Sequence, residues 1–182
     1  VASALYMALS RTVIRTTALT GRSPASSLMR ASDLIQKDRR SDLFLSAVYA
    51  KLDTDTGRLI FCNAGHNPAL LRRSDGGSFE ELTTNGIILG AFEGIELEEQ
   101  RVDMQPGDLL VLYTDGVTEA MDAEGEPFGV GRLRQIVTAH PEASPEQIIL
   151  ALEEAVRDFA GDVPQSDDIA LFVVWRRSGS EV

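Results

Sequence analysis

The stretch DLLVLYTDGVTEA, residues 108–120, decides the fold and raises its main chemical question. Leu109 to Tyr113 is an apolar run with the length and composition of a buried strand, and Asp115 and Gly116 end it. A carboxylate that is buried without a partner costs several kcal/mol or becomes protonated. We therefore expect Asp115 to be partnered by an arginine, by backbone amides or by a metal ion.

Outward from this stretch, the hydrophobic pattern predicts one domain, 1–182, in which strands cluster together instead of alternating with helices. Apolar residues recur at helical spacing near both ends of the chain, and alternating apolar residues separated by turn residues fill the middle. The predicted regions are helical at 1–40, strands at 43–114, helical at 130–159 and a closing, buried strand at 168–175. Within these regions, the Ser-Pro pairs at 23–24 and 144–145 predict helix starts, residues 43–64 a hairpin and residues 97–102 a further strand, and a polar loop is predicted after Asp115. This order favours an α+β fold with helices layered on antiparallel sheets.

Composition and charge limit the classes of partner. The formal net charge is −11, and the basic residues gather no further than the pairs Arg39–Arg40, Arg72–Arg73 and Arg176–Arg177, so we expect no nucleic-acid partner. Cys62 is the only cysteine, which excludes an intrachain disulfide and a cysteine-based zinc cluster. No apolar stretch has the length of a membrane span and no leader pattern is present, so we expect a cytoplasmic location.

The acidic residues around two of the predicted strands point to a metal site. Asp115 follows one apolar strand, and Asp167 and Asp168 precede another. If these strands are antiparallel neighbours, the carboxylates converge on one edge of the sheet, where a shared proton or a hard cation would relieve their repulsion. Gly116 favours the cation, because its missing side chain lets a carbonyl or a coordinated water approach, and Mg²⁺ or Mn²⁺ suits such a site.

Simpler interpretations of the same polar residues remain open at this point. Aspartates at strand ends commonly form turns, and Glu119 is typical of a solvated or capping residue. Asn63 and His66 lie in NAGHNP, where we expect them to hydrogen-bond the backbone of a bend and not to bind a metal.

Four motifs in this order resemble the metal-dependent serine/threonine protein phosphatases of the PPM (protein phosphatase 2C-like) family, in its bacterial SpoIIE-type branch of sporulation and stress-response proteins. The motifs are NAGHNPALLRR (63–73), PGDLLVLYTDGVTEAMD (106–122), GEPFG (125–129) and QSDDIALFVV (165–174). The resemblance implies an antiparallel β-sandwich flanked by helices, in αββα layers, that holds two Mn²⁺ or Mg²⁺ ions. It makes Asp115 and Asp167 catalytic metal ligands and adds Asp168 to the metal site with Gly116.

The resemblance also implies a function and a set of partners. It implies hydrolysis of phosphoserine or phosphothreonine by a metal-activated water, on a phosphorylated anti-sigma-factor antagonist, with a sensor domain or regulatory partner at the N-terminal helices; a homodimer stays open. The family has a further Gly-Asp motif on an N-terminal hairpin, ahead of the position where this sequence starts at Val1. We therefore expect these residues alone to bind metal weakly, and the alternative function is a phosphatase-like binding module without catalysis.

Overall fold

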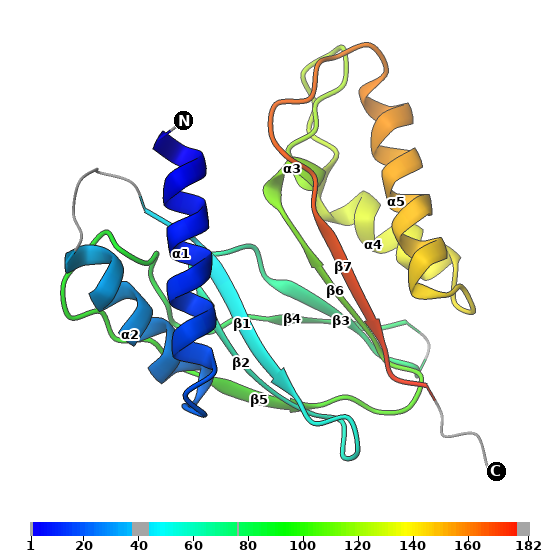
Figure 1. Ribbon diagram of the computed structural model, residues 1–182. Coiled ribbons are helices and arrows are strands. Elements are labelled where there is room, and N and C mark those ends of the chain that lie inside the picture. Colours follow the sequence, from blue (N-terminus) through cyan, green and yellow to red (C-terminus); the bar gives the residue numbers. More distant parts are fainter. Residues whose placement is uncertain (1, 38–43, 76, 178–182) are drawn as a thin grey trace. The chain divides into compact units, whose positions relative to one another are not determined.

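Two antiparallel sheets with helices packed against them make up the α+β fold of the computed structural model, which describes residues 2–37, 44–75 and 77–177 (Figure 1). The contacts divide the chain into two compact units, Val1–His66 with Thr83–Asp103 and Asn67–Leu82 with Met104–Val182. The predicted strand start at Leu43 and the Arg39–Arg40 pair lie outside the described residues. No helix in the described ranges is both long and apolar enough to cross a bilayer.

The first unit combines two helices with a three-stranded sheet in the order β1-β2-β5. Its elements are α1 (Ala2–Ala18), α2 (Pro24–Lys37), β1 (Ala47–Leu52), β2 (Arg58–Ala64) and β5 (Gln100–Asp103). The hydroxyl of Ser23 accepts the backbone N–H of Ser26 at 3.4 Å, and Pro24 opens α2, which confirms the predicted helix start. The predicted β1–β2 hairpin is also confirmed, with Leu52 opposite Leu59.

The second unit contains a four-stranded sheet in the order β4-β3-β6-β7. Its elements are β3 (Ala69–Arg72), β4 (Phe79–Leu82), β6 (Leu109–Tyr113), α3 (Asp115–Thr118), α4 (Gly129–Ala139), α5 (Pro145–Ala160) and β7 (Leu171–Trp175). Ser144 and Gln147 form a capping box at the start of α5, as the Ser-Pro pair predicts. α4 and α5 contribute Leu133 and Leu152 to the core formed with Val111 of β6.

Three elements differ from the sequence predictions. The strand predicted over residues 97–102 is β5, which begins at Gln100, and the loop predicted after Asp115 starts with the short helix α3. The closing strand begins at Leu171 and is only partly buried, with Phe172 63% exposed. The prediction of a buried strand was therefore wrong. An apolar run indicates a strand, but it does not show whether other elements cover one face of that strand or both.

The buried carboxylate of the 108–120 stretch is at its start. Asp108 is 1% exposed, and its oxygens accept hydrogen bonds from the Arg73 guanidinium at 2.9 Å and from the backbone N–H groups of Ser74 and Gln105 at 2.9 and 2.8 Å. An arginine and backbone amides are the partners that a buried carboxylate requires. Asp108 thereby joins β6 to the β3–β4 hairpin.

A second buried charge, Arg72 of β3, holds the end of α4. Its guanidinium donates to the backbone carbonyls of Val137, His140 and Pro141 at 3.1–3.4 Å, and burial lowers the pKa of Arg72 from its ordinary value. A helix leaves its last carbonyls without intrahelical partners, so this side chain supplies the missing donors.

Arg72→Met is expected to destabilise the fold by about 2–4 kcal/mol, because it removes a buried guanidinium that donates to three carbonyls at the end of α4, of which that of Val137 is buried. Urea unfolding followed by circular dichroism measures the change. Arg157→Met on α5 removes an arginine whose side chain is 71% exposed and should cost less than about 0.5 kcal/mol. Equal stabilities of the two variants would contradict the capping role of Arg72.

Candidate metal centre

The acidic segments meet where β6 and β7 continue past the end of their ladder. Tyr113 pairs with Leu171, and beyond this pair the N–H of Thr114 donates to the carbonyl of Ala170 at 3.1 Å. The Thr114 hydroxyl donates to the carbonyl of Asp168 at 2.8 Å and accepts the N–H of Ala170 at 2.9 Å. Thr114 therefore ties the segment before β7 to the residues that precede Asp115, and β6 and β7 are the adjacent antiparallel strands that the sequence predicted.

Gly116 allows the two segments to approach each other closely. A Cβ atom on this residue would lie 2.5 Å from the carbonyl oxygen of Asp168 and 2.9 Å from that of Asp167, closer than such atoms can come. The sequence pattern predicts that the missing side chain admits a backbone carbonyl or a coordinated water. In the structure it admits the backbone of Asp167 and Asp168, which lies directly against the start of α3.

The carboxylates at this edge are exposed. Asp115, Asp167 and Asp168 are all exposed, so the premise that Asp115 is buried was wrong; Asp108 has that role in this stretch. The Asp115 carboxylate accepts the N–H of Gly116 at 3.1 Å, and the Asp167 carboxylate accepts the N–H of Asp168 at 2.7 Å. A carboxylate has about four lone-pair sites, so both groups keep acceptor capacity for a cation.

The chemistry of these donors fits a hard divalent cation. The side chains at this edge provide carboxylate oxygens, and the only cysteine lies elsewhere, in β2. Across residues 2–37, 44–75 and 77–177, no group of three or more His, Cys, Asp or Glu side chains is placed to hold a metal. Mg²⁺ is commonly bound through one or two carboxylates with several retained waters, and a small oxygen donor set of this kind fits that pattern.

The other polar residues raised by the sequence have structural contacts. Asn63 accepts the N–H of His66 and donates to its carbonyl, both at 2.8 Å, as expected for a bend; the His66 ring instead pairs with the Ser46 hydroxyl at 3.0 Å. Glu119 is exposed and is the C-cap of α3. Burial, followed by the charge of Glu99, raises the pKa of the Cys62 thiol to about 11, so this thiol is a poor nucleophile.

Sequence reasoning missed Thr114, whose hydroxyl makes two of the contacts between the segments. The available signal was its position: a residue with a hydroxyl group stands between an apolar strand and an acidic turn. A threonine there also has high strand propensity, so the pattern alone does not distinguish a tie between segments from ordinary strand composition.

A comparison with known protein families identifies the family of this chain. Residues 1–177 match the family described as Stage II sporulation protein E (SpoIIE). The chain belongs to the SpoIIE family. Its mixed fold of antiparallel sheets and helices is that of PP2C-type phosphatase domains: the SiaA-PP2C domain of Pseudomonas aeruginosa aligns with a TM-score of 0.80 at 25% identity, over 95% of this chain and 70% of that one.

Two curated relatives extend the comparison. Protein IcfG of Synechocystis sp. is 31% identical over 134 residues, covering 74% of this chain and 21% of IcfG. The phosphoserine phosphatase RsbU of Bacillus subtilis is 22% identical over 175 residues, covering 96% of this chain and 52% of RsbU. The chain thus spans about half, or less, of these relatives. The relationship to PP2C-type phosphatases implies dependence on a divalent metal.

Proposed function

We propose that this chain is the catalytic part of a metal-dependent phosphoserine/phosphothreonine protein phosphatase in bacterial signalling. The observation that carries the proposal is the junction at Gly116, where the backbone of Asp167 and Asp168 lies against the residue that follows Asp115. The names of RsbU and RsbP, both phosphoserine phosphatases of Bacillus subtilis, support the same reaction. They do not favour the alternative of a binding module without catalysis.

In this proposal the acidic edge, which consists of Asp115, Gly116, Asp167 and Asp168, binds and orients the reacting groups. Asp115 and Asp167 provide ligand oxygens, and Asp168 and the backbone of Gly116 provide the remaining protein contacts to the cation. Thr114 holds the segment before β7 next to Asp115. Two Mn²⁺ or Mg²⁺ ions in the complete domain would supply activation of a water molecule and offset the charge of the phosphate oxygens. No nucleophilic side chain is needed, which agrees with the buried Cys62.

The finer parts of the proposal concern partners and location. We assign as substrate a phosphorylated anti-sigma-factor antagonist in the cytoplasm, by analogy with the SpoIIE-type branch. A sensor domain or regulatory partner at the N-terminal helices is supported by the exposed apolar side chains of α1, where Leu5 is 67% and Met7 59% exposed. A homodimer through the same helices is an alternative arrangement.

The proposed reaction is tested by the metal dependence of hydrolysis in the complete protein. Turnover of p-nitrophenyl phosphate should rise with added Mn²⁺ or Mg²⁺ and fall at least tenfold on chelation, because the ions activate the attacking water. Re-addition of metal should restore it, which separates metal loss from unfolding. Turnover that is unchanged after exhaustive chelation would contradict the proposed mechanism.

A further inference from the structure

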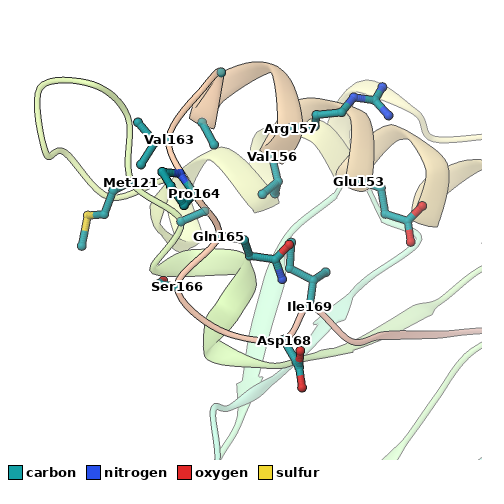
Figure 2. A pocket seen from close by; sticks show the side chains of 13 residues that line it. Met121, Glu153, Val156, Arg157, Val163, Pro164, Gln165, Ser166, Asp168 and Ile169 are labelled. Atoms are coloured by element: carbon teal, nitrogen blue, oxygen red, sulfur yellow. The ribbon is translucent and has the colours of Figure 1, made fainter.

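A pocket of about 520 Å³ lies beside the acidic edge, between the C-terminal half of α5 and the loop that leads to β7 (Figure 2). Val156 on α5 and Ile169 on the loop lie on facing sides of it, and Asp168 lies at one end. All of its lining residues belong to the second unit. The pocket therefore begins at a residue that the proposed metal site also uses.

The lining of this pocket combines apolar side chains with charged and polar ones, among them Gln165, which donates to the backbone carbonyl of Asp167. Ala120 and Val156 are 6% and 3% exposed and form the buried part, while Met121 is 39% exposed. Glu153 and Arg157 of α5 are exposed lining residues. Apolar lining side chains together with a few polar groups are typical of ligand-binding pockets.

Because the pocket lies next to Asp168, its position indicates which apolar group of a substrate it would bind. Successive residues of an extended peptide advance by about 3.3 Å, so a residue two positions from a phosphoserine lies about 7 Å from it. A phosphoserine held at the acidic edge would therefore carry its near neighbours past Asp168 and along the pocket. We propose that this pocket binds an apolar side chain of the phosphoprotein substrate, close in sequence to the phosphorylated residue. This inference rests on the proposed phosphatase function and adds a determinant of substrate choice.

A leucine scan of phosphoserine peptides in the complete protein tests the inference. Each peptide carries one leucine at a different position near the phosphoserine in an alanine background. One position should raise kcat/KM about tenfold over the all-alanine peptide, mainly through KM, because an apolar pocket discriminates on this scale. p-Nitrophenyl phosphate has no flanking residue and serves as the reference substrate.

Three variants then test whether the leucine preference comes from this pocket. Ala160→Phe fills the pocket from α5 and should abolish the leucine preference while leaving p-nitrophenyl phosphate turnover within about twofold of the parent. Ala151→Phe places the same change on α5 outside the pocket and should keep the preference. Met121→Gln replaces an apolar lining side chain by a polar one without filling the pocket and should weaken the preference even if Ala160→Phe does not fold.

Each other outcome overturns the proposal. A flat leucine scan, or a preference that persists in Ala160→Phe and Met121→Gln, would show that no apolar neighbour of the phosphoserine binds here, while the phosphatase function stands. Equal losses on peptides and on p-nitrophenyl phosphate would show that the pocket only supports the acidic edge. A parent protein without metal-dependent turnover would remove the proposed function itself, and the inference with it.

Discussion

Asp115→Asn is expected to lower kcat/KM for p-nitrophenyl phosphate in the complete protein by about 10³-fold, or about 4 kcal/mol of transition-state stabilisation. The substitution keeps the size of the side chain and an oxygen that can accept the Gly116 N–H. It removes the negative charge that we assign to cation binding. Steady-state kinetics at saturating Mn²⁺ measure the loss.

Asp158→Asn on α5 is the matched control for this prediction. Its side chain is 81% exposed, and its Oδ1 lies 4.0 Å from Nε of Arg157, with which it forms an exposed ion pair. The same change of charge should leave p-nitrophenyl phosphate turnover within about twofold, because an exposed pair contributes little. An Asp115→Asn enzyme as active as the parent would show that this carboxylate is not a ligand.

Gly116→Ala is expected to reduce kcat/KM by about 10- to 100-fold through the addition of one methyl group. The new Cβ would lie 2.5 Å from the Asp168 carbonyl, so the segment with Asp167 and Asp168 must shift away from Asp115. The displacement should also raise the Mn²⁺ concentration needed for half-maximal activity. Metal titration of turnover measures both effects.

Gly131→Ala in α4 separates this steric effect from a general response to losing a glycine. Apart from its chain neighbours and the backbone of its own helix, no heavy atom of the described residues lies within 4 Å of the Cβ that it would add. Alanine is the better helix former, so the variant should retain full activity and be as stable as the parent or up to about 1 kcal/mol more stable. Full activity and unchanged metal dependence of Gly116→Ala would contradict the close packing at this junction.

The elements of the chain were predictable where local signals are strong. The Ser-Pro starts of α2 and α5, the β1–β2 hairpin and the strand β6 follow from caps, turn residues and apolar spacing, and the structure confirms each of them. The metal-site hypothesis required the strands next to Asp115 and Asp167 to be antiparallel neighbours, and the pairing of β6 with β7 meets this condition.

Burial around the site was not predictable, because it depends on which strands pair. Asp108 is buried since β3 pairs with β6, Arg72 opposite Leu109, which places Arg73 within reach of that carboxylate. The sequence shows two aspartates around one apolar run and cannot say which is inside. The close approach at Gly116 likewise depends on a segment about fifty residues further along the chain, which local patterns do not encode.

The metal-binding roles of Asp115, Gly116, Asp167 and Asp168 stay predictions. The structure supports them by the contacts of their backbones and by their exposed carboxylates. Family membership supports them through the reaction that relatives are named for. Direct measurement of cation binding is the step that decides the roles.

The most direct test of the central claim, that the Asp115 and Asp167 segments bind one cation site, is a double-mutant cycle of Mn²⁺ affinity. Calorimetric titration of the parent, Asp115→Asn, Asp167→Asn and the double variant gives the four affinities. We predict that each single change weakens binding at least tenfold and that the double variant loses less than the product of the two, because ligands of a shared site are coupled. Single variants that bind Mn²⁺ as the parent does, or losses that simply multiply, would contradict a shared site.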